Sequence, residues 1–209
     1  MRLTEKYRPT RLEDVLGQDK AVGTLSRLPA GGRAFYIKGP SGTGKTTIAR
    51  IIAAQVADSL YTREIVGRQL TSAELRSFVD KWPYTCLYGK SGYALIVNES
   101  HGLRKDVIEI LLDVLENLPE HVTVIFTTTR EGADLFEDQI DAAPFASRCV
   151  QVSLTSRGLC PLFAARLKEI AQVEGLDGQP VESYERLLKD CRNNFRAALQ
   201  QVESGQMLA

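Results

Sequence analysis

One short segment constrains the fold of this chain more than any other, namely Gly39-Pro40-Ser41-Gly42-Thr43-Gly44-Lys45-Thr46. It fits the phosphate-binding pattern G-x-x-x-x-G-K-T, with an apolar run at 34–37 before it and helical spacing over 45–56 after it. Glycines let consecutive backbone N–H groups turn toward phosphate oxygens, and the start of a helix presents its positive end to the same anion. The segment therefore predicts a strand, a phosphate-binding loop and a helix.

Two residues of this loop carry the chemistry. The ammonium of Lys45 suits the β- and γ-phosphates of ATP, and the hydroxyl of Thr46 suits Mg²⁺. The sequence thus predicts ATP and Mg²⁺ as cofactors, with a glycine-rich turn that binds nothing as the alternative. The nucleotide-binding residues predicted here are Gly39, Pro40, Ser41, Gly42, Thr43, Gly44, Lys45, Thr46 and Thr47.

Apolar runs alternate with amphipathic segments along residues 18–152. Runs fit for strands lie at 34–37, 64–66, 93–97, 122–126 and 150–152, and 93–97 reads as the central one. Helical spacing marks 18–28, 45–56 and 106–117, and Thr71 with Glu74 forms a capping-box pattern before a helix through Phe78. Residues 1–17 look irregular. This order predicts an α/β fold whose parallel sheet is covered on both faces and binds ligands at the carboxyl ends of its strands.

The pattern becomes purely helical after Leu154. The expected helices are 156–173, 181–191 and 194–202, with Gly175 to Gly178 separating the first two. We expect a nucleotide-binding core over 1–155 and a small helical lid over 156–209.

Composition narrows the class of protein. There are 26 basic and 26 acidic residues, so net charge gives no support to a strongly basic nucleic-acid-binding protein. The four cysteines, one of them Cys86, show no C-x-x-C spacing, and we expect small buried thiols instead of metal ligands or disulfides. No apolar run reaches the about 20 residues that a membrane helix needs. We expect a soluble protein of the cytoplasm, or of the nucleus in a eukaryote.

The strand at 93–97 leads into Asn98 and Glu99. P-loop ATPases normally place an aspartate there to hold the Mg²⁺ shell. In this sequence Asn98 takes that position. Asn98 and Thr46 are therefore the two residues predicted to bind the metal. Glu99 stands where a carboxylate would deprotonate the attacking water. Two alternatives stay open: the pair only caps the strand, or nucleotide binds and hydrolysis is slow.

The opening segments Glu5–Pro9 and Leu12–Gln18 resemble those of clamp-loader ATPase subunits of the replication factor C small-subunit type, which are AAA+ proteins. The resemblance implies a P-loop AAA+ core with a parallel sheet flanked by helices, plus a small C-terminal all-helical lid. It also implies that this segment wraps the adenine, although a simple packing strap is the alternative. The matching positions are Tyr7, Arg8, Pro9, Val15 and Leu16.

Further matches follow along the chain. The resemblance implies that Thr129 is the sensor-1 residue, that Arg148 in Ser147-Arg148-Cys149 is an arginine finger for a neighbouring subunit, and that Arg196 is the sensor-2 residue. Glu99, Thr129 and Arg148 are therefore the predicted catalytic residues. The sequence departs from the family at Leu3, where tryptophan is frequent, at Asn98, and at Asn193-Asn194, where Gly-Asp is usual. The segment 130–145 is also longer than the family's.

The leading hypothesis is an ATP-binding and ATP-hydrolysing AAA+ subunit that acts in an oligomer in DNA replication or repair. The implied partners are other AAA+ subunits, a sliding clamp and primer-template DNA, and the residues considered for DNA contact are His101, Arg104 and Lys105. The alternative is a nucleotide-binding structural subunit with little hydrolysis, because Asn98 lacks the usual charge. A small-molecule kinase is a third class, and the helical tail with Arg196 argues against it.

Overall fold

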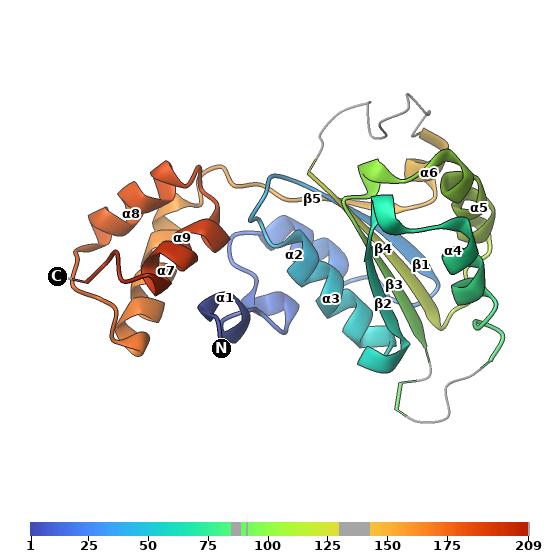
Figure 1. Cartoon of the computed structure of the whole chain (residues 1–209), viewed down its shortest axis with the longest axis horizontal. Helices are drawn as coiled ribbons and strands as arrows, with labels where there is room; N and C mark the ends of the chain where they lie inside the picture. The colour runs from blue at the N-terminus through green and yellow to red at the C-terminus, as the bar shows by residue number, and fades with distance from the viewer. Residues whose placement is uncertain (85–88, 91, 130–142, 209) are drawn as a thin grey trace. The chain divides into compact units, whose positions relative to one another are not determined.

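The structure is a computed structural model that describes residues 1–84, 89–90, 92–129 and 143–208 (Figure 1). The chain packs into two units, each described below by itself. The larger comprises Gly23–Gly39 and Lys45–Ser153, and the smaller comprises Met1–Val22, Pro40–Gly44 and Leu154–Ala209. The predicted division into 1–155 and 156–209 stays a prediction.

The larger unit is built on a parallel sheet. Within the described ranges it has five strands in the order β2-β3-β4-β1-β5. The strands are β1 (Arg33–Lys38), β2 (Thr62–Val66), β3 (Tyr93–Asn98), β4 (Val122–Thr128) and β5 (Val150–Ser153). This confirms the predicted α/β class and each predicted strand. The expectation that residues 93–97 form the central strand is wrong by one position, because β4, whose residues are all buried, is in the middle and β3 lies next to it.

Helices cover both faces of this sheet. Figure 1 shows α3 (Lys45–Val56) on one face and α4 (Ser72–Val79) with α5 (Lys105–Glu116) on the other. On α5, Val107, Leu111 and Leu115 recur every four residues and are buried, so one stripe of the helix packs into the core. Fully burying each such side chain stabilises the fold by about 1.5–3 kcal/mol.

The start of α4 is fixed by its own residues. Thr71 Oγ1 accepts a hydrogen bond from the Glu74 N–H at 3.2 Å, and the Glu74 carboxylate accepts one from the Thr71 N–H at 3.2 Å. The predicted capping box is therefore confirmed. Other short elements of the chain are η1 (Leu12–Asp14), α2 (Asp19–Leu25), η2 (Ser59–Tyr61), η3 (Gly67–Gln69), η4 (Ser100–Gly102) and α6 (Ala143–Ser147).

The smaller unit is helical, as the sequence predicts. It contains α7 (Cys160–Glu174), α8 (Val181–Asp190) and α9 (Phe195–Glu203). Its core gathers Phe163, Leu167, Tyr184, Leu188 and Leu199. The first helix begins four residues later than expected, because Gly158 turns the chain with a φ of +74° and Pro161 stands in the first turn of α7.

The expectation that residues 1–17 are irregular is wrong in part. The helix α1 (Leu3–Lys6) forms there, and Leu3 is buried in the core of the smaller unit. Gln18 holds the end of this segment by two hydrogen bonds to the backbone of Thr155, of 2.8 and 3.2 Å. A four-residue helix has little stability alone, so the packing of Leu3 sustains it.

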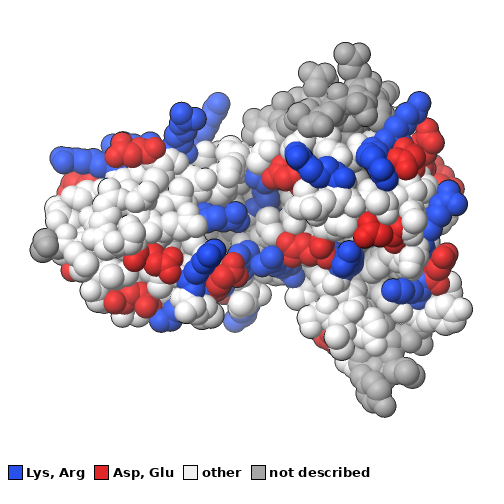
Figure 2. All heavy atoms as spheres, in the orientation of Figure 1, with Lys and Arg blue, Asp and Glu red and all other residues white. Residues whose placement is uncertain are grey.

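Charges are mixed on the surface of the larger unit. On the face visible in Figure 2, basic and acidic side chains alternate, which agrees with the zero formal net charge. No helix among the described residues is long and apolar enough to cross a membrane.

Candidate nucleotide site

The phosphate-binding loop connects β1 to α3. Gly42 and Gly44 have φ of +78° and +96°, values that only glycine adopts readily. Within the smaller unit, Thr43 Oγ1 donates to the Pro40 carbonyl at 2.9 Å. Within the larger unit, Lys45 Nζ donates to the Gly39 carbonyl at 2.8 Å, and Lys45 is only 7% exposed. A buried ammonium at the start of a helix suits an anionic ligand.

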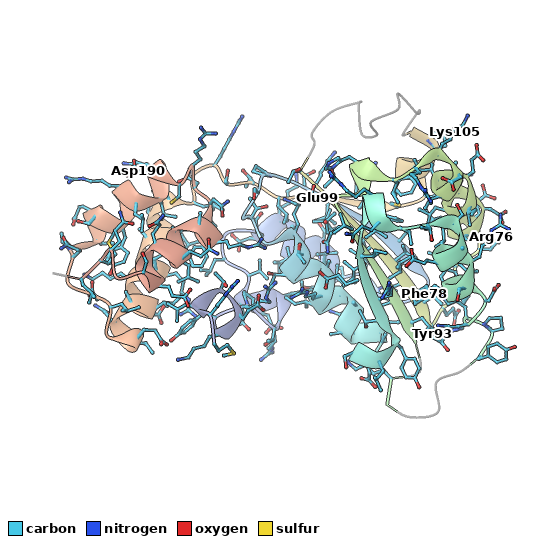
Figure 3. The ribbon with its side chains drawn as sticks, viewed as in Figure 1. Arg76, Phe78, Tyr93, Glu99, Lys105 and Asp190 are labelled. Carbon is cyan, nitrogen blue, oxygen red and sulfur yellow. The ribbon has the colours of Figure 1, made fainter. Side chains whose placement is uncertain are left out.

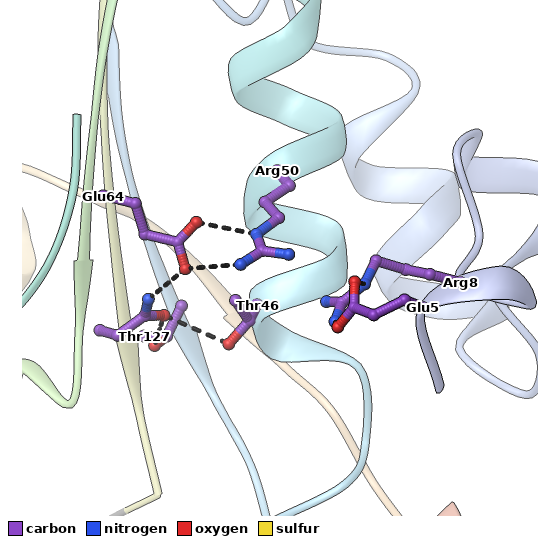
Figure 4. Close-up of polar contacts among 7 residues, drawn as sticks. Glu5, Arg8, Thr46, Arg50, Glu64 and Thr127 are labelled. Atoms are coloured by element: carbon purple, nitrogen blue, oxygen red, sulfur yellow. Dashed lines mark hydrogen bonds and ion pairs between the residues drawn. The ribbon is translucent and has the colours of Figure 1, made fainter. Parts of the chain in front are cut away.

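The side chain of Asn98 is the centre of a polar network at the end of β3. Its Oδ1 accepts hydrogen bonds from Thr46 Oγ1 at 3.2 Å and from Thr127 Oγ1 at 3.0 Å (Figure 4). Its Nδ2 donates to Glu64 Oε1 at 2.8 Å. The two residues predicted for the metal, Thr46 and Asn98, are therefore in direct contact, and their two oxygens face each other.

Glu64 is held in turn by Arg50. The guanidinium donates from Nε to Glu64 Oε2 at 2.8 Å and from Nη2 to Glu64 Oε1 at 3.1 Å. Arg50, Glu64 and Thr127 were not among the residues that the sequence predicted for the site. Glu64 could have been noticed in the sequence, because it is a carboxylate within a predicted strand. Its two partners could not, because they lie 14 and 34 residues away in the chain.

Glu99 directly follows β3 and has a left-handed backbone, with φ of 51°. Thr129 Oγ1 donates to Glu99 Oε2 at 3.0 Å, so the predicted sensor and the predicted base touch. His101 Nδ1 lies 3.4 Å from the same carboxylate oxygen and 3.2 Å from Thr128 Oγ1. The Glu99 side chain is 40% exposed, which lets water reach it (Figure 3).

Arg148 lies just after α6 and is engaged within its own chain. Its Nη1 donates to the Pro144 carbonyl at 2.7 Å, and its Nη2 forms an ion pair with Glu116 at the end of α5. The neighbouring Cys149 is buried, which raises the pKa of its thiol to about 12. The role of Arg148 in a neighbouring subunit stays a prediction. The segment 130–142 before it, and Cys86, lie outside the described residues.

The predicted adenine-wrapping segment belongs to the smaller unit. Tyr7 donates its hydroxyl hydrogen to the Glu174 carboxylate at the end of α7, and Lys6 Nζ lies 2.6 Å from the same carboxylate. The hydrogen bond from Lys6, then that from Tyr7, lowers the pKa of Glu174, and the Glu174 contact raises the pKa of Tyr7. The ring of Tyr7 therefore packs with α7.

Other residues of this segment have different neighbours. Arg8 Nη2 pairs with Glu5 Oε1 at 2.5 Å, and both are drawn in Figure 4. A Cβ added to Gly44 would lie 4.0 Å from Val15 Cγ1, so the buried Val15 adjoins the phosphate-binding loop. Pro9 and Leu16 are half-buried, and Thr47 is buried on α3.

The start of α9 lies against the phosphate-binding loop, inside the smaller unit. Asn194 is the N-cap of this helix, with Oδ1 accepting from the Ala197 N–H at 3.2 Å and Nδ2 donating to Ser41 Oγ at 3.4 Å. A Cβ on Gly42 would lie 2.1 Å from Asn194 Oδ1, so this approach requires glycine. Arg196 is exposed two residues beyond the cap.

Residues 34–157 match the family described as "AAA domain (dynein-related subfamily)", which is more than half of the chain. The chain belongs to the AAA domain family. This match spans the phosphate-binding loop, Asn98, Glu99 and Arg148.

Two relatives carry names from DNA replication. Replication factor C small subunit 1 of Pyrobaculum arsenaticum is 28% identical over 183 residues, covering 83% of this AAA domain chain and 52% of that protein. DNA polymerase III subunit gamma of Buchnera aphidicola is 28% identical over 230 residues, covering 96% of this chain and 60% of that protein. The chain thus spans less than two thirds of either relative. These relatives confirm the resemblance to replication factor C small subunits.

Solved structures agree on the fold. The RuvB Holliday junction branch migration motor of Thermotoga maritima superposes with a TM-score of 0.67 at 22% identity, covering 94% of this chain and 64% of that one. At this identity the likeness concerns the fold of the AAA domain.

Proposed function

We propose that this AAA domain binds ATP with Mg²⁺ and hydrolyses it as one subunit of an assembly that acts in DNA replication. The observation that carries the proposal is the contact between Thr129 and Glu99 beside the Asn98 network, at the carboxyl ends of β3 and β4. Ligands of open parallel sheets bind at this edge.

The residues present fit ATP and Mg²⁺. Gly42 and Gly44 give the loop the backbone angles that turn N–H groups toward phosphates, and Lys45 is a buried cation at the same loop. Thr46 Oγ1 and Asn98 Oδ1 are hard oxygen donors that suit Mg²⁺ or its bound waters. When bound, Mg²⁺ would neutralise charge on the β- and γ-phosphate oxygens.

In the proposed mechanism, Glu99 accepts the proton of the water that attacks the γ-phosphate, and Thr129 orients the Glu99 carboxylate. Lys45 stabilises the charge on the transferred phosphoryl group. Arg148 of one subunit would supply a further positive charge to the site of a neighbour, and such a finger accelerates phosphoryl transfer by about 10³–10⁵-fold in other systems. The sensor-2 role of Arg196 on α9 stays a prediction.

The alternative of a structural subunit with little hydrolysis is not favoured. Asn98 lacks a charge, but its oxygen still faces Thr46, and Glu99 is present with Thr129 as its partner. A small-molecule kinase also lacks support, because the relatives are named for DNA replication.

The partners are proposals that rest on the names of the relatives. We propose other AAA+ subunits, a sliding clamp and primer-template DNA, in the cytoplasm or the nucleus. Arg104 and Lys105 are exposed at the start of α5, and we propose them for phosphate contacts. Figure 3 shows Lys105 on this helix. The ring of His101 instead lies beside Glu99 and Thr128.

Equilibrium binding of a fluorescent ATP analogue tests the nucleotide site. We expect saturable binding by the wild-type chain and loss of most affinity in Lys45→Ala. The matched control is Lys189→Ala, which removes an exposed lysine of α8. Equal affinity of Lys45→Ala and the wild type would refute the proposed site.

A further inference from the structure

The amide of Asn98 has two ends with opposite chemistry, and the structure fixes which end faces Thr46. The oxygen accepts from two hydroxyls, those of Thr46 and Thr127, while the nitrogen donates to Glu64. A carboxylate oxygen only accepts hydrogen bonds, so turning the amide over would place Asn98 Oδ1 against Glu64 Oε1 without any hydrogen between them. Glu64 thereby selects one of the two orientations.

The secondary structure places Glu64 close to both Asn98 and Arg50. On the sheet, Val66 pairs with Asn98, so Glu64 and Asn98 are diagonal neighbours on adjacent parallel strands. On α3, Arg50 follows Thr46 by four residues, which places both on one face of the helix. Two hydrogen bonds from Arg50 then hold the carboxylate in one position.

The network is open to solvent on the β2 side. A pocket of about 430 Å³ is lined by Glu64 and Asn98 together with Arg63, Ile65, Val66, Gln69 and Glu74. The hydrogen bond between Asn98 and Glu64 is therefore accessible to solvent on the β2 side.

We propose that Glu64 is a positioning residue that lets an asparagine serve where P-loop ATPases normally use an aspartate. The inference rests on the proposed function of the site. Arg50 holds Glu64, Glu64 binds the amide nitrogen of Asn98, and the amide oxygen is thereby directed to the Mg²⁺ position beside Thr46.

This arrangement predicts a specific outcome for the substitution Asn98→Asp. The substitution replaces Nδ2, which lies 2.8 Å from Glu64 Oε1, with a second carboxylate oxygen. Two like charges at hydrogen-bond distance repel, so the aspartate is not held in the productive position. In the double variant Asn98→Asp with Glu64→Gln, an amide N–H of residue 64 donates to the new carboxylate and holds it again.

The experiment measures the affinity of the nucleotide-bound protein for Mg²⁺, by titration of the fluorescence of a bound ATP analogue and by electron paramagnetic resonance with Mn²⁺. Glu64→Met keeps the length of the side chain and removes the acceptor. We expect it to weaken metal affinity about 10-fold, the lower end of the range for residues that orient metal ligands. Asn98→Asp should not bind Mg²⁺ more tightly than the wild type, and the double variant should bind it about 10-fold more tightly than Asn98→Asp.

The controls separate the inference from the proposed function. Glu109→Gln removes an exposed carboxylate of α5 and should leave metal affinity unchanged. Arg50→Gln should weaken metal affinity in the same direction as Glu64→Met, which keeps the test valid if one variant folds poorly. Unchanged metal affinity in both Glu64→Met and Arg50→Gln, or an Asn98→Asp variant as tight as the double variant, would overturn the inference alone. Absence of any nucleotide binding by the wild type would refute the proposed function and the inference with it.

Discussion

Thr129 Oγ1 donates a hydrogen bond to Glu99 Oε2 at 3.0 Å, which joins the residues that follow β4 and β3. The sequence points to these residues for separate reasons, one as a sensor and one as a base. Their contact means that the orientation of the Glu99 carboxylate depends on the Thr129 hydroxyl.

We therefore expect Thr129→Val to lower kcat for ATP hydrolysis by about 10-fold or more while KM changes little. A positioned base contributes about 10²–10⁴-fold to the rate, and loss of its orienting hydroxyl should remove part of that contribution. Thr129→Ser keeps the hydroxyl and should retain most of the rate. Steady-state kinetics check both. If the valine and serine variants have the same kcat, the hydroxyl has no part in hydrolysis.

The ion pair between Arg148 and Glu116 holds the predicted finger in its own chain. Both side chains are partly exposed, so the pair adds little stability and can be exchanged for a contact with another subunit. We expect Glu116→Gln to raise the specific ATPase activity at low protein concentration, because the guanidinium is then released more easily.

A mixing experiment checks the same finger. Arg148→Ala should lose at least about 10³-fold in rate, and Lys45→Ala should be inactive by loss of its own site. A mixture of the two should recover activity, since one variant brings an intact site and the other an intact finger. Activity of the mixture no higher than the mean of the separate variants would argue against Arg148 acting between subunits.

The stability of the smaller unit should depend on pH through Glu174. Lys6 and Tyr7 hold the pKa of this half-buried carboxyl below its ordinary value. A lowered folded-state pKa means that the contribution to stability is present above the ordinary carboxyl range and is lost as the pH falls through the folded-state pKa.

Urea unfolding from pH 7 to pH 3 checks this dependence, with Glu174→Gln beside the wild type. The difference in midpoint should be greatest near neutral pH and vanish at the acid end. A difference that stays constant over the whole range would show that the charge of Glu174 is not involved.

Cys149 should resist alkylation in the folded protein. Burial raises the pKa of its thiol to about 12, and only the thiolate reacts at an appreciable rate. Iodoacetamide labelling at pH 8, followed by peptide mass spectrometry, should modify the partly exposed Cys160 well before Cys149. Equal labelling rates for the two in the absence of denaturant would contradict the burial of Cys149 beside Arg148.

The elements that the sequence predicts well are those with strong local signals. The glycine-rich loop and the following Lys45 define the start of α3, and a continuous apolar run over residues 93–97 defines β3. The short helix α1 escapes prediction because the burial of Leu3 against residues far along the chain sustains it, and local propensity does not.

The contacts of the candidate site were harder to predict. The hydrogen bond of Asn98 to Glu64 depends on the register between β2 and β3, which no local pattern states. The pair of Arg148 with Glu116 likewise joins residues 32 positions apart. Sequence motifs thus identified residue types and chain positions, whereas their partners came from strand order and helix packing.

The most direct test of the account is steady-state ATP hydrolysis measured over a wide range of protein concentration, with Lys45→Ala as the blank. We expect a rate above the blank, with a specific activity that rises with protein concentration and then levels off, because sites are completed between subunits. A rate equal to the blank at every concentration would contradict an ATPase assembled from this chain.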